Sequence, residues 1–187
     1  MKTQMTSPDS YLFKWFDHIN SEGSFNSGMD DFPRPPTTTY HVDAQCWMYK
    51  LTKFMWRASE KFDRPATAGY YIQMTKIKDN LRKLLDPSRH IFLDTTVNYM
   101  GYSEYSPHVG YGSLLPIAFG MLEPDTIEFN ATLKLMSDTT MLNSTHGLSS
   151  IATSSPYYLM NKDAYWRGPV WLNMNYLALR GLKLHYA

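Results

Sequence analysis

The 187-residue sequence has a single cysteine, no long apolar run and no excess of charge of either sign. Cys46 cannot form an internal disulfide, and its place beside Trp47 in a helical pattern indicates a buried, small apolar group. No stretch approaches the ~20 apolar residues of a membrane span, and the first ten residues lack the apolar segment of a secretory signal. Eighteen Lys and Arg nearly balance seventeen Asp and Glu, which disfavours nucleic acid or an anionic membrane as partner.

Metal ligands are also scarce in the sequence. Apart from His41, the histidines have no cysteine or carboxylate partner at the spacing of a metal site; they stand at positions 18, 90, 108, 146 and 185. We therefore predict no catalytic metal and no cofactor. Two sequons, at Asn130 and Asn143, are compatible with a secretory compartment and do not establish one.

Aromatic residues are abundant: the chain has 14 Tyr, 9 Phe and 5 Trp, many of them in polar stretches that contain Gly and Pro. Rings displayed on loops suit flat ligands such as sugars. A bulky core would explain the same composition, and composition alone leaves both readings open.

The strongest helical pattern covers residues 40–62 and places seven apolar residues at three-and-four spacing: Val42, Trp47, Leu51, Phe54, Met55, Ala58 and Phe62. Pro65 is expected to end this helix, and Thr67 to cap a second one that stops before Asp86. Two long helices joined by so few residues should pack antiparallel.

Three further helices are predicted at 113–121, from Pro124 to about Ser137, and at 170–186. Alternating strand patterns are scarce, so the predicted class is all-α. The loops at 20–40, 98–112 and 145–169 are long and dense in Gly, Pro, aromatic and charged residues, whereas loops that only connect tend to be short. Function is therefore expected at the loop end of a helical scaffold.

The first such loop contains the sequence S-G-M-D-D-F-P-R at 27–34. Gly28 permits a sharp turn and Pro33 stiffens the exit, so Asp30 is held on a rigid loop with Arg34 four residues further on. A carboxylate that is partly shielded from water there could donate a proton. On this stretch alone, the favoured alternative is that Asp30 or Asp31 caps the following turn.

Two other stretches carry polar candidates. His41 and Asp43 open the 40–62 helix, where Asp43 could simply complement the helix N-terminus and His41 could be a satisfied loop histidine. His108 and Tyr111 lie in a glycine-containing segment that could line a pocket or form a plain turn.

The last stretch is Y-W-R-G-P-V-W-L-N at 165–173. Trp166 and Trp171 offer apolar faces for a sugar ring, and Arg167 before Gly168 offers donors for its hydroxyls. A tryptophan-anchored helix start would explain the tryptophans but not the polar groups between them.

Four motifs in this order resemble glycoside hydrolase family 63, the processing α-glucosidases I (mannosyl-oligosaccharide glucosidases): S-G-M-D-D-F-P-R at 27–34, H-V-D-A-Q-C-W-M at 41–48, H-V-G-Y-G-S-L-L-P at 108–116 and the long segment from Tyr165 to Tyr186. The resemblance implies an (α/α)6 toroid of antiparallel helix pairs with the active site at the loop end. It also implies inverting hydrolysis of a terminal α-1,2-linked glucose on the triglucosylated N-glycan precursor. The compartment implied is the endoplasmic reticulum, with membrane-anchored full-length relatives.

The resemblance implies a role for each site residue as well. Asp30 is the general acid, and the residues expected to bind substrate or shape its pocket are Asp31, Phe32, Arg34, His41, Asp43, His108, Tyr111, Trp166, Arg167, Gly168 and Trp171. In inverting enzymes a second carboxylate, about 6.5 to 9.5 Å from the acid, activates the attacking water. In the family this base is a glutamate well beyond the 165–173 motif.

Two departures from the family pattern qualify these expectations. The chain stops at Ala187, before the region of the base, so residues 1–187 are expected to form a partial catalytic domain that lacks its closing helices and is inactive alone. Ser149 also stands where relatives have arginine in a Gly-Leu-Arg-Ser pattern. The alternatives are a related toroid glycosidase of trehalase-like type, and a non-catalytic glycan-binding or helical scaffold protein.

Overall fold

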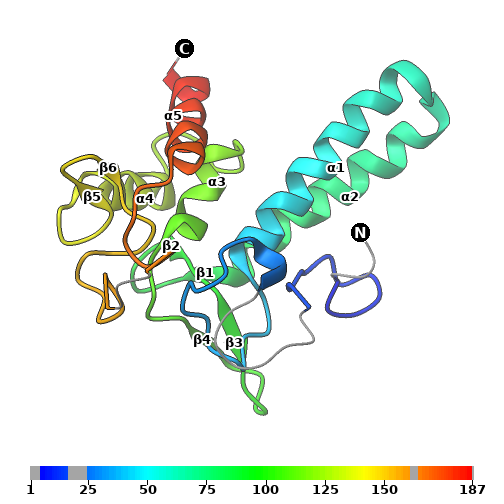
Figure 1. The fold of residues 1–187 in the computed structure, drawn as a ribbon. Coiled ribbons are helices and arrows are strands. Elements are labelled where there is room, and N and C mark those ends of the chain that lie inside the picture. Colours follow the sequence, from blue (N-terminus) through cyan, green and yellow to red (C-terminus); the bar gives the residue numbers. More distant parts are fainter. Residues whose placement is uncertain (1–4, 17–24, 161–163, 187) are drawn as a thin grey trace.

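The computed structural model describes residues 5–16, 25–160 and 164–186. Its longest elements, α1 (Val42–Phe62) and α2 (Arg64–Asn80), form an antiparallel hairpin that projects from the rest of the molecule (Figure 1). Only Asp63 separates the two helices, and its backbone N–H donates to the carbonyl of Ser59. The predicted pair of long antiparallel helices is confirmed.

The boundary between these helices differs from the prediction. Pro65 does not end α1; it is the second residue of α2, where the backbone N–H that proline lacks would have no partner in the helix. Thr67, predicted to cap α2, lies inside it, and its hydroxyl oxygen is 3.1 Å from that of Ser59. The prediction of Thr67 as a cap is therefore wrong.

The other helices are shorter: η2 (Phe25–Ser27), η3 (Leu81–Leu84), η4 (Tyr111–Leu114), α3 (Leu115–Ala118), α4 (Ile127–Ser137) and α5 (Leu172–Tyr186). Three antiparallel hairpins accompany them: β1 (Leu85–Asp86) with β2 (Ile91–Phe92), β3 (Thr95–Val97) with β4 (Ser103–Tyr105), and β5 (Asn143–Ser144) with β6 (Gly147–Leu148). The predicted helical character is confirmed. The hairpins escaped prediction because strands of two or three residues are too short to show an alternating pattern.

Local contacts mark where α4 and α5 begin. The Thr126 hydroxyl accepts the N–H of Phe129 at 3.3 Å, so α4 starts at Ile127, and Pro124 lies before it rather than in its first turn. Val170 pairs with Ser149 in an isolated β-bridge, and α5 begins two residues later, at Leu172.

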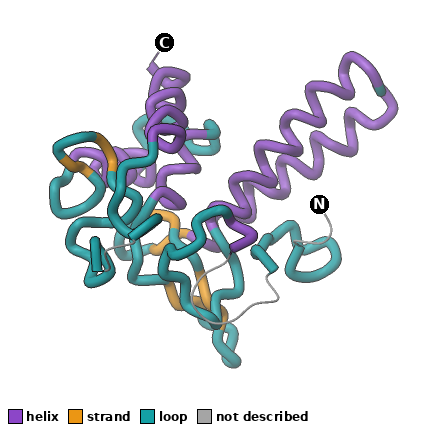
Figure 2. Tube along the Cα trace, viewed as in Figure 1, coloured by secondary structure: helices purple, strands orange, loops and turns teal. Residues whose placement is uncertain are grey.

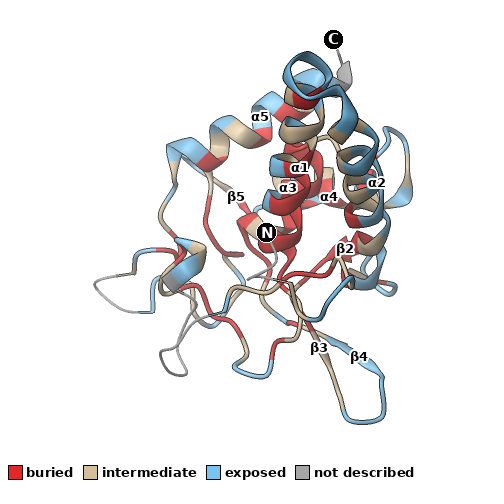
Figure 3. Cartoon of the chain, turned by 90° about the vertical axis from the view of Figure 1, so that its right-hand side faces the viewer, coloured by how far each residue is buried: buried red, intermediate tan, exposed pale blue. Residues whose placement is uncertain are grey.

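The core lies around α3, which is buried between α1 and α5 (Figure 3). Gly181 allows α5 to approach α3 closely, because a Cβ at this position would lie 2.5 Å from the Ala118 Cα. Cys46 is fully buried in α1, as predicted, and burial raises the pKa of its thiol well above the ordinary value.

The predicted apolar face of α1 is largely wrong. Trp47, Leu51, Phe54 and Phe62 are exposed, with Phe62 at 87 %. The core contacts come from the first turns of α1, where the buried residues lie on several sides of the helix: Val42, Asp43, Ala44, Gln45, Cys46, Met48 and Tyr49. The distal half of α1 projects from the body with α2, so apolar spacing does not predict burial there (Figure 1).

Many of the loops lie below the helices in Figure 2, at the end of the molecule away from the tip of the α1–α2 hairpin. Isolated β-bridges join them pairwise: Tyr40 to Thr95, Gly110 to Ile151 and Ser149 to Val170. Segments distant in the sequence are thereby fixed side by side. Within the described ranges, no helix has the length and apolar character needed to cross a bilayer.

Candidate active site

The opening loop turns at Gly28, whose φ of +72° lies in the region that favours glycine. The Ser27 hydroxyl accepts the N–H of Met29 at 3.1 Å, and the carbonyl of Met29 accepts the N–H of Phe32 at 3.1 Å. Asp30 and Asp31 occupy the turn between these bonds. The half-buried Asp30 carboxylate has no hydrogen bond or ion pair within the described part of the chain, so it does not cap the turn.

Asp31 connects this loop to the 165–173 stretch. Its two carboxylate oxygens accept the backbone N–H groups of Tyr165 at 3.0 Å and Trp166 at 2.5 Å. The Nε of Arg167 donates to the Asp31 carbonyl at 2.5 Å and lies 3.9 Å from its carboxylate. Asp31 therefore bonds to a distant segment rather than to its own turn, which makes it a link between two loops.

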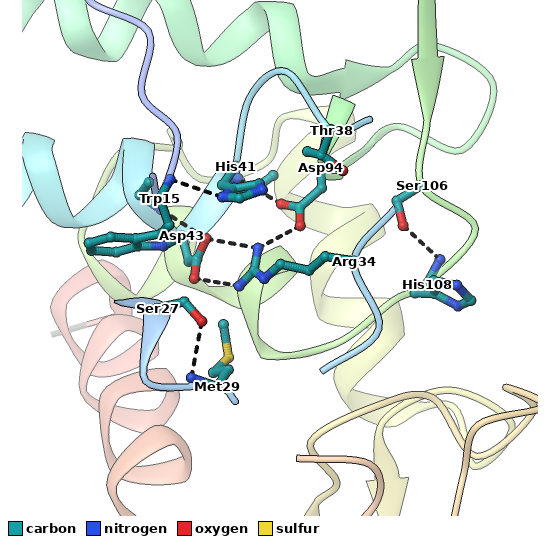
Figure 4. A network of polar contacts seen from close by, with 12 residues as sticks. Trp15, Ser27, Met29, Arg34, Thr38, His41, Asp43, Asp94, Ser106 and His108 are labelled. Carbon is teal, nitrogen blue, oxygen red and sulfur yellow. Dashed lines mark hydrogen bonds and ion pairs between the residues drawn. The ribbon is translucent and has the colours of Figure 1, made fainter. Parts of the chain in front are cut away.

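Arg34 lies at the other end of the loop, in a buried ion cluster (Figure 4). Its Nη2 and Nη1 contact the Asp43 carboxylate at 2.6 and 3.2 Å, and Nη1 also contacts Asp94 Oδ2 at 2.6 Å. Burial acts to lower the pKa of Arg34, but Asp43 and Asp94 outweigh it and raise that pKa. The other Asp94 oxygen accepts the N–H of Val42 at 2.9 Å, the first residue of α1.

His41 lies beside this cluster and precedes α1. Its Nδ1 accepts the backbone N–H of Trp15 at 3.1 Å, so this nitrogen carries no proton. Burial, with the nearby Arg34 guanidinium, lowers the pKa of His41 to about 3 despite the opposing charge of Asp43. His41 is therefore neutral at physiological pH and joins the N-terminal segment to the site.

Phe32 and Gly110 hold the opening loop against the 108–116 segment. Phe32 is buried, and a Cβ at Gly110 would lie 2.4 Å from its Cε2 and 2.6 Å from the Ser150 carbonyl oxygen. The backbone at Gly110 thus comes so close to the ring that no side chain fits between them.

Tyr111 is fully buried, and its hydroxyl joins three segments. It donates to the Leu148 carbonyl at 2.6 Å and accepts the Trp171 N–H at 2.9 Å and the Asn175 side-chain amide at 3.2 Å. Burial raises the pKa of Tyr111, and the bonds from Trp171 and Asn175 partly oppose this. The ring thus positions the start of α5.

The indole rings of Trp166 and Trp171 stack, with centroids 3.9 Å apart and an interplanar angle of 4°. Tyr165 meets the Trp171 ring edge-on at 4.8 Å and accepts the Trp171 Nε1–H through its carbonyl. Trp166 is buried, Trp171 is half-buried and Tyr165 is 53 % exposed. Tyr165 and Trp171 are therefore the rings of this cluster that solvent reaches.

Gly168 and His108 complete the set of predicted residues. Gly168 has a φ of +138°, and a Cβ at this position would lie 2.6 Å from the Leu159 side chain. Its backbone N–H donates to the Ser150 hydroxyl at 2.8 Å. The His108 and Tyr157 rings meet edge-on, with their centroids 5.0 Å apart. The Arg167 guanidinium lies over the Tyr157 ring, 5.4 Å from its centroid. Burial, together with Arg167, lowers the pKa of His108.

The structure thus brings the predicted residues into two neighbouring groups linked by the 30–34 loop. One group surrounds Asp31: Tyr111, Trp166, Arg167, Gly168 and Trp171, with His108 reached through Tyr157. The other surrounds Arg34: His41 and Asp43. Most of these side chains are committed to protein contacts, and their roles toward a substrate stay predictions.

Sequence reasoning missed Asp94 and Tyr157. Asp94 follows the apolar run I-F-L at 91–93, and its partner Arg34 lies 60 positions away, so nothing in the local pattern announces the contact. As for metals, the described residues contain no group of three or more His, Cys, Asp or Glu side chains that could hold an ion.

Solved structures define the class of this fold. The chain superposes on a structure titled sialidase with a TM-score of 0.72 at 15 % identity, over 88 % of this chain and 15 % of that one. It also matches a family 63 mannosylglycerate hydrolase from Thermus thermophilus in complex with glucose (TM-score 0.63, 16 % identity, 79 % and 33 % of the two chains). The neutral trehalase of Saccharomyces cerevisiae gives 0.61 at 15 % identity, over 79 % and 28 %. The fold is that of a helical glycosidase.

The family follows from the sequence. The model of the glycosyl hydrolase family 63 C-terminal domain matches residues 8–187, so the chain belongs to this family. It is 33 % identical over 168 residues to a probable mannosyl-oligosaccharide glucosidase of Schizosaccharomyces pombe, and 29 % identical over 167 residues to the mannosyl-oligosaccharide glucosidase of Saccharomyces cerevisiae. Each match covers 86 % of this chain but only 20 % of the relative, so the chain spans about a fifth of their length.

Proposed function

We propose that this chain supplies the proton-donating part of an inverting α-glucosidase that removes the terminal α-1,2-linked glucose from the triglucosylated N-glycan precursor. The observation that carries the proposal is the state of Asp30. The neighbouring carboxylates Asp31, Asp43 and Asp94 are all bonded to protein groups, whereas Asp30 has no partner in the described residues and is half-buried on a fixed turn. A carboxyl group that donates a proton to substrate must be able to hydrogen-bond the substrate, and Asp30 is not occupied by a protein partner in the described residues.

In this mechanism Asp30 protonates the glycosidic oxygen as the bond to the anomeric carbon breaks. A second carboxylate, about 6.5 to 9.5 Å from the first, removes a proton from the water that attacks the opposite face of the sugar. By resemblance to the family, that base is a glutamate beyond the 165–173 motif, on the later helices of the proposed (α/α)6 toroid; this chain spans about a fifth of its relatives' length. Tyr165 and Trp171, both reached by solvent, would contact the glycan.

The names of the relatives support a protein of N-glycan processing in the endoplasmic reticulum, and the two sequons are compatible with that compartment. The partner of the site is then a glucosylated oligosaccharide, with no nucleic acid, metal or cofactor involved. Anchoring to the membrane would be a property of the full-length protein.

The test uses the full-length natural product of the gene with a triglucosylated N-glycan, and trehalose as the competing substrate. We expect release of one glucose from the glycan and none from trehalose, with β-glucose appearing first in the proton NMR spectrum because inversion converts the α-linkage. Hydrolysis of trehalose alone, or α-glucose as the first product, contradicts the proposal.

A further inference from the structure

The loop that carries Asp30 is fixed at two points, and the second of these involves a residue outside the predicted site. Asp31 is bonded to residues 165–167, and Arg34 is bonded to Asp43 and Asp94. Asp43 belongs to the helix that follows the loop. Asp94 comes from the link between β2 and β3, so it fixes the loop to a separate part of the fold (Figure 4).

We infer that Asp94 is a positioning residue for the general acid, acting through Arg34. This inference rests on the proposed function of Asp30. The Arg34 side chain is 4 % exposed, and its Nη1 contacts Asp94 Oδ2 at 2.6 Å, so little solvent screens the ion pair. The arginine can leave this position only by leaving two buried carboxylates without their cation.

Asp94 is itself rigidly held. Its carbonyl accepts the N–H of Ser106 at 2.8 Å, and its neighbour Thr95 exchanges backbone hydrogen bonds with Tyr40 at 2.9 and 3.0 Å. The carboxylate is 10 % exposed and also binds the first N–H of α1. Because these bonds leave the Asp94 side chain few other conformations, Asp94 determines the position of the Arg34 guanidinium.

The position of Arg34 is transmitted to Asp30 through a short, stiff segment. Pro33 is buried, and the Phe32 ring lies under the guanidinium at 5.5 Å and against the backbone of Gly110. With Arg34 fixed at one end and Asp31 at the other, the segment from 31 to 34 has little room to move. The Asp30 side chain has no bond to any described residue, so it takes its position from this segment.

The charge balance makes the inference testable. The cluster has two carboxylates and one guanidinium, with a neutral His41 beside it. Asp94→Asn therefore leaves a balanced Arg34–Asp43 pair instead of an unpaired buried charge. The asparagine oxygen can still accept the Val42 N–H, whereas its amide group turns a donor toward Arg34. The substitution breaks one contact and keeps the helix contact.

The experiment compares Asp94→Asn with Asp86→Asn in the full-length protein. Asp86 is a buried carboxylate of the neighbouring hairpin that bonds Arg89 and Ser88 rather than Arg34. Each variant is assayed on the glycan and on an α-glucoside whose nitrophenolate leaving group needs little protonation. Hydrogen exchange is followed at the N–H of Phe32, which closes the Asp30 turn.

For Asp94→Asn we expect kcat/KM on the glycan to fall about 100-fold, as for a reacting group displaced by ~1 Å, and to fall only a few-fold on the nitrophenyl substrate. Hydrogen exchange at the Phe32 N–H should accelerate about tenfold in Asp94→Asn. Asp86→Asn should change neither this exchange rate nor the ratio of kcat/KM on the glycan to kcat/KM on the nitrophenyl substrate. If Asp94 had a purely structural role, Asp94→Asn would lower kcat/KM by the same factor on both substrates. If Asp94→Asn does not fold, Arg34→Lys tests the same contact, because one ammonium cannot span both carboxylates.

The outcomes separate the two proposals. A wild-type enzyme that is active, with equal losses on both substrates or unchanged Phe32 exchange in Asp94→Asn, overturns the role of Asp94 alone. A wild-type enzyme that releases no glucose from either substrate overturns the proposed function and with it this role.

Discussion

The Asp31 carboxylate accepts a hydrogen bond from the backbone N–H of Trp166 at 2.5 Å, although the two residues are 135 positions apart. This bond, with its companion to Tyr165, joins the turn of the predicted acid to the aromatic cluster before α5. The arrangement gives Asp30 and Asp31 different tasks: within the described ranges one carboxylate has no partner, and the other holds two loops together.

The first prediction concerns Asp30. Asp30→Asn should lower kcat of the full-length enzyme on the glycan by about 10²- to 10⁴-fold, because the amide keeps the shape but cannot donate the proton. Circular dichroism and the unfolding midpoint should stay at wild-type values. The matched control is Asp125→Asn at an exposed position, which should retain full activity. Undiminished turnover by Asp30→Asn would refute its assignment as the acid.

A second prediction concerns Asp31. Asp31→Asn replaces one acceptor oxygen with an amide that faces a backbone N–H, which should lower the free energy of unfolding by about 1 to 3 kcal/mol. Urea unfolding measures this change, and Asp79→Asn, exposed on α2, should shift it by less than about 0.5 kcal/mol. Equal effects of the two substitutions would show that the link between the loops contributes nothing to stability.

The third prediction compares alanine substitutions at two glycines of the 108–116 segment, Gly110 and Gly112. In Gly110→Ala the new Cβ would clash with the Phe32 ring at 2.4 Å and with the Ser150 carbonyl at 2.6 Å, whereas a Cβ at Gly112 meets nothing within 4 Å. Gly110→Ala should therefore destabilise the protein by about 1 to 3 kcal/mol and reduce activity by displacing the loop, while Gly112→Ala should do neither. Thermal unfolding of both variants decides the point; a stable Gly110→Ala protein would contradict the close packing.

The fourth prediction concerns pH. The pKa of His41 is about 3 in the folded protein and about 6.5 when unfolded, so below pH 6.5 the unfolded state binds a proton that the folded state does not. The stability that neutral His41 contributes is fully present above pH 6.5 and is lost as the pH falls toward 3, by about 1.4 kcal/mol per pH unit.

The matched variant for this test is His41→Asn, which keeps an acceptor for the Trp15 N–H and does not titrate. Urea unfolding at about pH 7, 6, 5 and 4 should show the wild-type stability falling more steeply than that of the variant. Parallel curves would mean that the folded protein accommodates a charged His41.

Sequence patterns predicted α1, α2 and α5 because each is long enough for its periodicity to be read. The patterns misplaced the buried face of α1, since Leu51 and Phe54 have the right spacing but lie where α1 leaves the body. The loop motifs were found through their resemblance to a family, and turn chemistry alone favoured a local cap at Asp30 or Asp31. The actual partners of Asp31 are far away in the sequence, as is the partner of Arg34 at Asp94, and such contacts leave no local signal.

The link between Asp31 and Trp166 also has a consequence for folding, because it joins residues 135 positions apart. The α1–α2 hairpin depends on neighbouring residues and can form while the chain is still being synthesised, because local contacts close quickly. The local bonds of the Asp30 turn can form early, but its link through Asp31 needs the chain beyond Trp166, and closing so long a loop costs entropy. The candidate proton donor therefore reaches its final position only after residues 165–167 have joined the opening loop.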